Sequence, residues 1–112
     1  MLSREDFAFT IGYDGERAVI DGKARSQYGS LGTTELAEKG LYRAAFASAL
    51  WAMNQEGTRD KATDKSKVDA QAEMEALIAH FNKVAGTSYS RPEDLQRLFG
   101  VALETVTRTL VL

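Results

Sequence analysis

The sequence contains no cysteine, a single histidine and a single proline in 112 residues. Without a thiol, the chain has no disulfide framework, zinc–thiolate site, iron–sulfur cluster or cysteine nucleophile. His80 would have to serve every histidine-dependent reaction, and no Gly-x-Ser-x-Gly motif accompanies it. We therefore predict a protein that is not an enzyme, with no catalytic residue to name and no cofactor.

Long apolar runs and an excess of positive charge are also missing. No stretch reaches the roughly 18 apolar residues of a membrane span, and the N-terminal segment has no continuous apolar run and carries Glu5 and Asp6 where a signal peptide would carry bases. We expect a cytoplasmic protein with no membrane contact. Fourteen Lys and Arg against sixteen Asp and Glu give a net charge of −2, which disfavours nucleic acid as a partner.

The composition that is present is that of a globular domain. Hydrophobic residues make up 44% and charged residues 27% of the chain. We predict one α+β domain over residues 1–112, in which an N-terminal two-stranded antiparallel β-hairpin packs on a three-helix bundle (ββααα). The expected segments are a hairpin at 6–21, a loop at 22–33, a helix at 34–54, a charged connector at 55–66, and helices at 67–85 and 92–110.

The hairpin is predicted from apolar residues that alternate along positions 7–13 and from the Asp14-Gly15 pair that follows them. An Asp-Gly pair between two strand-like runs favours a two-residue turn. Such a turn would place residue 11 opposite 18 and residue 9 opposite 20. The expected apolar face of the sheet holds Phe9, Ile11, Ala18 and Ile20.

The helix predicted at 34–54 begins after a threonine cap and carries apolar residues on several sides. Gly40 inside it would cost about 1 kcal/mol relative to alanine, which indicates a close approach of another backbone or a bulky side chain. This helix has more apolar surface than a hairpin and two helices cover. We therefore expect a homodimer interface, with these candidate residues: Gly40, Ala44, Ala47, Trp51, Leu110 and Leu112.

The two later helices have clear signals at their ends. Apolar residues recur at three- and four-residue steps up to Gly86, which favours a helix at 67–85. Pro92 with Glu93 and Asp94 marks the start of the helix at 92–110. Aromatic side chains at helical spacing are expected to pack together in the core, namely Phe46, Trp51, Phe81 and Phe99.

A glycine- and threonine-rich loop before residue 34 resembles the general arrangement that holds an anion on free backbone N–H groups. It lacks the lysine and the spacing of a P-loop, and a flexible cap ahead of a helix explains it equally well. Basic and aromatic residues beside it would suit a phosphate-bearing ligand or nucleic acid. The candidate residues are Lys23, Arg25, Tyr28, Gly29, Gly32, Thr33, Thr34, Lys39 and Arg43.

A metal site would have to use His80 with Glu73, which stand seven residues apart and thus two helical turns from each other. Zinc sites need at least three protein ligands, so we predict no metal and interpret His80 as a surface residue.

Two hypotheses for function remain. The first is a small soluble non-catalytic interaction or accessory protein that associates with a second copy of itself, or with another protein, in a biological process that the sequence does not name. The alternative is a small regulator that binds nucleic acid or a phosphate-bearing ligand through residues 23–43.

Overall fold

The computed structural model describes residues 3–54, 64–101 and 108–112. The fold is α+β, with a three-stranded mixed sheet and several helices. The elements in chain order are α1 (Arg4–Ala8), β1 (Thr10–Asp14), β2 (Arg17–Ile20), α2 (Gly22–Tyr28), α3 (Thr33–Glu38), α4 (Tyr42–Met53), α5 (Asp64–Ala85), α6 (Pro92–Phe99) and β3 (Arg108–Val111).

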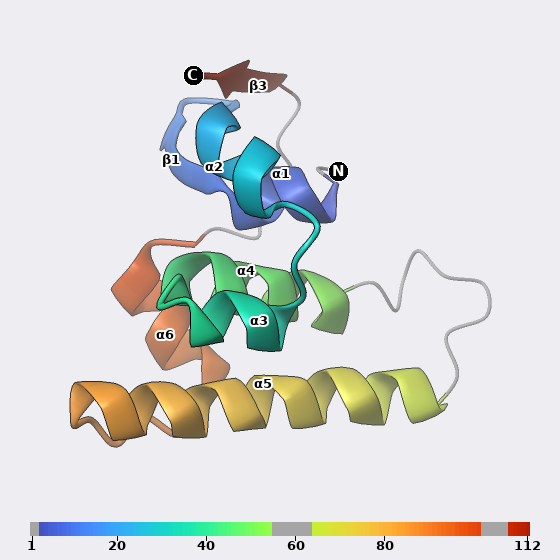
Figure 1. The fold of residues 1–112 in the computed structure, drawn as a ribbon, viewed down its shortest axis with the longest axis vertical. Helices are drawn as coiled ribbons and strands as arrows, with labels where there is room; N and C mark the ends of the chain where they lie inside the picture. The colour runs from blue at the N-terminus through green and yellow to red at the C-terminus, as the bar shows by residue number, and fades with distance from the viewer. Residues whose placement is uncertain (1–2, 55–63, 102–107) are drawn as a thin grey trace.

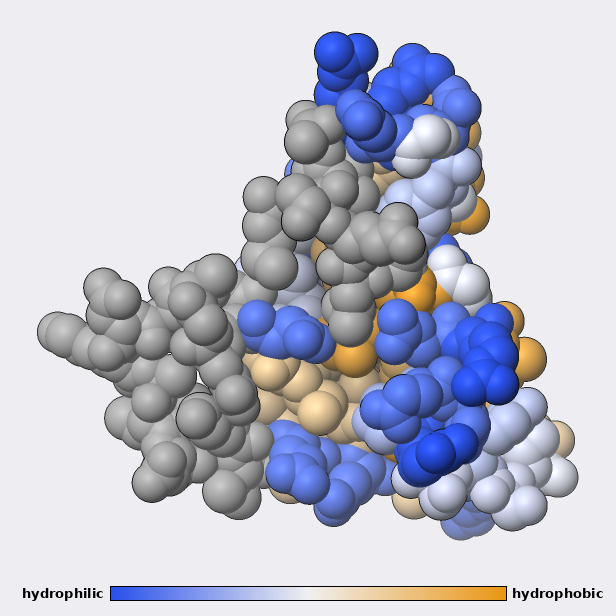
Figure 2. Space-filling view, turned by 180° about the vertical axis from the view of Figure 1, so that it is seen from behind, coloured by the Kyte–Doolittle hydropathy of each residue, from blue (hydrophilic) through white to orange (hydrophobic). Residues whose placement is uncertain are grey.

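The elements stack in layers around α4 (Figure 1). The strands, α1 and α2 lie at one end of the molecule, α3 and α4 lie side by side in the middle, and α5 crosses the other end. Helix α4 contacts α1, α3, α5 and α6, and its residues from Ala44 to Leu50 are all buried. On the face seen from behind, apolar residues lie near the middle of the molecule, with polar residues above and below them (Figure 2).

A single hydrophobic cluster joins these layers. Its largest fully buried apolar side chains come from β2, α3, α4, α5 and α6, and they are Ile20, Leu36, Phe46, Met74 and Leu95. Burial of each such side chain is worth about 1.5–3 kcal/mol. The predicted aromatic packing is present, because the rings of Phe46 and Phe81 lie 5.8 Å and 5.4 Å from that of Phe99. Trp51 packs against the same cluster.

Strands β1 and β2 form the predicted hairpin, but the predicted register is wrong. The turn lies one residue later in the chain than we predicted. Asp14 pairs with Arg17, so the two turn residues are Gly15 and Glu16. Gly15 has φ +59°, and no non-glycine residue in the described ranges has positive φ. This is the pattern of a Gly-X turn, which needs positive φ only at its first central residue, and not of the type I′ turn that Asp-Gly would make.

The predicted apolar face of the hairpin changes with the register. Ala18 and Ile20 are fully buried, but Ile11 is 53% exposed, because the ladder shifts between Thr10 and Gly12. Thr10 is buried in its place, and its hydroxyl donates a hydrogen bond to the carbonyl of Asp6 at 2.6 Å. The irregularity turns Ile11 outward.

Short helices replace segments that we predicted as strand or loop. Residues 6–9 belong to α1 and its C-terminus, and the hydroxyl of Ser3 accepts from the N–H of Asp6 at the start of this helix. Residues 22–28 of the predicted loop form α2, where the Asp21 carboxylate accepts from the N–H of Ala24. In both cases a capping side chain starts a helix that is too short to show apolar periodicity.

The helix predicted at 34–54 is two helices, α3 and α4. Gly40 has φ +79° and follows the end of α3, where a left-handed residue terminates a helix. The prediction of a close approach at Gly40 was wrong, because a Cβ there would meet no heavy atom within 4 Å. Gly40 is present for its backbone conformation.

The helix predicted at 67–85 agrees with α5, which begins three residues earlier, at Asp64. Residues 55–63 of the predicted connector lie outside the described ranges, and residues 64–66 belong to α5. The helix predicted at 92–110 ends at Phe99, because Gly100 takes a left-handed conformation with φ +65°. No helix in the described residues is long and apolar enough to cross a membrane.

The last strand, β3, completes the sheet at residues that we predicted as helix. The sheet order is β1-β2-β3, with β1 antiparallel and β3 parallel to β2. The start of α2 lies directly against β3, because a Cβ at Gly22 would meet Val111 Cγ1 at 2.6 Å and the carbonyl oxygen of Leu112 at 2.7 Å. Glycine at position 22 therefore permits the docking of β3.

We predict that Gly22→Ala destabilises the protein by about 1–3 kcal/mol, because the added methyl group overlaps β3. The loss is measured by urea denaturation, and amide hydrogen exchange should show faster exchange at Leu112, whose N–H donates to the carbonyl of Ile20. Gly12→Ala is the control, because a Cβ at that position of β1 meets nothing within 4 Å. Equal stability of the two variants would contradict the close packing of Gly22 on β3.

Candidate functional site

Arg4, the first residue of α1, connects three parts of the chain. Its Nε donates to the hydroxyl of Ser48 at 2.9 Å and its Nη1 to the carbonyl of Gly29 at 3.0 Å. Its Nη2 donates to the carbonyl of Leu31. One guanidinium thus joins α1 to the segment between α2 and α3, and both to α4.

Ser48 extends this network into the core. Its hydroxyl also accepts a hydrogen bond from Thr33 at 3.0 Å, and both side chains are buried. Among the described residues, no buried side-chain nitrogen or oxygen lacks a hydrogen-bond partner. The sequence analysis missed Arg4, although a serine within the apolar run 44–50 is a signal, because a buried hydroxyl requires a polar partner.

The predicted anion-binding loop uses its polar groups within the fold. The carbonyls of Gly29 and Leu31 face Arg4, and the N–H of Gly32 donates to the Glu35 carboxylate at 3.3 Å. This carboxylate lies at the start of α3, where an added anion would have to bind. Gly29 is buried, and a Cβ on it would meet the carbonyl oxygen of Arg25 at 2.4 Å, so packing explains this glycine.

The residues of the predicted basic patch do not act together in the structure. Arg25 pairs with Asp6 at 2.5 Å, and Arg43 donates from Nε to the carbonyl of Phe99 at 3.0 Å. Lys23 and Lys39 are exposed. Thr33 is buried and Thr34 exposed, and Tyr28 packs against the core. The structure therefore places the two arginines in internal contacts, and the anion site stays a prediction that these contacts do not favour.

The guanidinium of Arg43 is partly buried. Desolvation by burial lowers the pKa of its guanidinium below the ordinary value, and Tyr13 acts in the opposite direction and raises that pKa. The carbonyl that Arg43 binds belongs to the last residue of α6, so the positive charge also complements the C-terminal end of that helix. Arg43 fastens α6 to α4.

The predicted interface residues separate into two groups. Ala44 and Ala47 are buried inside α4, and Trp51 is half-buried against the core. These residues pack within the molecule, whereas Gly40 is exposed but carries no side chain. Leu110 and Leu112 are 39% and 70% exposed on the C-terminal strand. Among the predicted interface residues, the exposed apolar side chains therefore lie at the C-terminal strand and not on α4.

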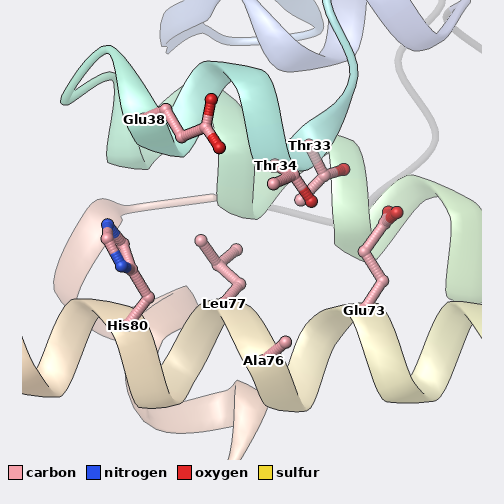
Figure 3. Close-up of a pocket in the computed structure, with 7 residues that line it drawn as sticks. All are labelled: Thr33, Thr34, Glu38, Glu73, Ala76, Leu77 and His80. Atoms are coloured by element: carbon pink, nitrogen blue, oxygen red, sulfur yellow. The ribbon is translucent and has the colours of Figure 1, made fainter.

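A cavity of about 180 Å³ lies between α3 and α5 (Figure 3). It is lined by Thr33, Thr34, Glu38, Glu73, Ala76, Leu77 and His80. His80 lies 3.2 Å from the hydroxyl of Tyr42 through its Nε2. Although Glu73 and His80 line the same cavity, the described residues contain no group of three or more side chains that could hold a metal ion. Sequence reasoning named these two residues but not the cavity.

The chain was compared with models of known protein families, with curated proteins and with solved structures, and none of the three comparisons found a match. The geometry of the molecule is therefore the basis for a functional proposal.

We predict that Arg4→Met destabilises the protein by about 2–4 kcal/mol. Methionine keeps most of the side-chain volume, but the carbonyls of Gly29 and Leu31 and the hydroxyl of Ser48 lose a charged donor. Thermal or urea denaturation measures the loss. Arg17→Met is the matched control, because its ion pair with Asp14 is exposed and such pairs are worth about 1 kcal/mol or less. Similar losses in both variants would show that Arg4 does not stabilise these contacts.

Proposed function

We propose that this protein is a non-catalytic interaction module that associates with a second copy of itself through strand β3. The observation that carries the proposal is the exposure of three consecutive apolar side chains at the edge of the sheet. Leu110 is 39%, Val111 46% and Leu112 70% exposed. Exposed apolar side chains at the edge of a sheet favour contact with another protein.

Strand β3 also has backbone groups to offer a partner. It pairs with β2 on one side, and within the described residues no strand pairs with its other side. An edge strand with apolar side chains is a template for the addition of a further strand. The one charged side chain of this strand, Arg108, stands at its first position and not next to Leu112.

The register of β3 on β2 determines which side chains at this edge point away from the core. Val111 pairs with Ile20, which is fully buried, and Leu110 pairs with Val19, which is half-buried. Paired residues in a ladder point to the same face. Leu110, and Leu112 two positions later, therefore lie with Val19 on the face opposite to the core.

A second copy of this chain is the partner that fits this edge. Two identical strands that meet antiparallel across a two-fold axis satisfy each other's backbone groups and form an isologous interface. Leu110 is the middle residue of the segment 108–112, so an axis there would bring the same apolar residue from both copies together. The sheets of the two copies would then be continuous.

We predict a monomer–dimer equilibrium in sedimentation experiments at micromolar to submillimolar concentrations. Leu110→Lys should shift it to the monomer, because a charge would be placed at the centre of the paired strands. Leu98→Lys is the control, because Leu98 is 51% exposed but belongs to α6 and not to the sheet.

Thr109→Pro tests the strand pairing itself. The N–H of Leu112 donates to β2, so by strand alternation the N–H of Thr109 points away from β2. Proline removes that outward donor and should weaken the dimer at least tenfold while the protein stays folded by circular dichroism. A monomer at all concentrations, or a dimer that Leu110→Lys and Thr109→Pro leave unchanged, would refute the proposal.

A further inference from the structure

The cavity between α3 and α5 is built by two helical faces that meet. On α5, Glu73, Ala76, Leu77 and His80 follow one another at steps of three, one and three residues, which places them on one face of the helix. On α3, Thr34 and Glu38 stand four residues apart and share a face in the same way. The cavity thus has a wall from each helix.

The floor of this cavity is apolar and its rim carries negative charge. Leu77 is only 5% exposed, whereas the carboxylates of Glu38 and Glu73 are exposed. Neither carboxylate forms a hydrogen bond or ion pair within the described part of the chain. Figure 3 shows Glu38 on α3, on the side of the cavity where His80 and Leu77 lie, and Glu73 on α5 toward the other end, on the side of Thr33.

These groups select the charge of a ligand. No lysine or arginine among the described residues lines the cavity, so an anion would meet two carboxylates and no opposite charge from that part of the chain. A cation would be stabilised by both. The hydroxyl of Thr33 already donates to Ser48, so toward the cavity it offers only lone pairs, and Thr34 can accept as well.

The donor set and the volume of the cavity favour a small organic cation over a metal ion or a drug-sized ligand. A metal ion is not favoured, because no three suitable ligands come together in the described residues. The volume of about 180 Å³ is smaller than that of cavities that take drug-sized ligands, which are roughly 300–1,000 Å³. An apolar floor between two carboxylates suits a short alkyl chain with an ammonium group at each end.

We propose that the α3–α5 cavity binds a short aliphatic diamine. One ammonium group binds Glu38 and the other binds Glu73, and the methylene groups between them cover Leu77. His80 lies at the end of the cavity and is held by its contact with Tyr42. This site is separate from β3, so it does not depend on self-association.

The probe is 1,4-diaminobutane, added to the 112-residue protein and followed by NMR. Because the chain has a single histidine, the ring signals of His80 report on the cavity without ambiguity. We expect saturable shifts with a dissociation constant in the millimolar range, since exposed ion pairs are weak. Butylamine should bind more weakly, and 1,4-butanediol should not bind.

Four variants distinguish a built site from general attraction by charge. Glu38→Gln and Glu73→Gln should each weaken binding about two- to fivefold. Glu75→Gln is the matched control, because Glu75 is exposed on the same helix but does not line the cavity. Ala76→Leu fills the cavity without a change of charge and should abolish binding.

The proposal is overturned if the diamine causes no saturable shift, if Glu75→Gln weakens binding as much as the two cavity variants, or if Ala76→Leu has no effect. Equal affinity for 1,4-butanediol would also overturn it, because the carboxylates would then have no role. Circular dichroism of each variant confirms that a loss of binding is not a loss of fold.

Discussion

The hydrogen bonds of Arg4 are the constraint on which the arrangement of the layers depends. A guanidinium that is mostly removed from water must find partners for its N–H groups, and Arg4 finds them in Gly29, Leu31 and Ser48. Since two of these partners are backbone carbonyls, the path of the chain between α2 and α3 is fixed by a side chain from α1. The position of α3 beside α4 follows, and with it one wall of the cavity that faces α5.

The sheet is organised around β2, which is its central strand and carries the fully buried Ala18 and Ile20. Each neighbour of β2 is an edge, but the two edges differ. Strand β1 ends in the Gly15 turn and has an irregularity at Ile11, which makes it a poor template for a further strand. Strand β3 pairs with β2 without an irregularity, and all its side chains, including the apolar Leu110 and Val111, are exposed. Of the two edges, β3 is therefore the better template for a further strand.

Features that rest on local sequence were predictable. Helix α5, the existence of the hairpin and the start of α6 at Pro92 follow from periodicity, a turn pair and a capping pattern. The hairpin register was missed because Gly15 occupies the first central position of the turn and not the second. Strand β3 was missed because its apolar residues also fit a helical stripe, and only the pairing of Leu110 with Val19 makes it a strand. The cavity joins residues 33–38 to residues 73–80, and no pattern in the sequence relates such distant segments.

The parallel pairing of β3 with β2 has a consequence for the order of folding. Residues 17 and 108 are partners, so this contact closes almost the whole chain into one loop, whereas β1 and β2 are joined by a tight turn. Loop closure makes distant contacts slower to form than local ones. We infer that β3 joins the sheet last. During synthesis on the ribosome, the edge of β2 that will pair with β3 then stays unpaired until residues 108–111 have emerged.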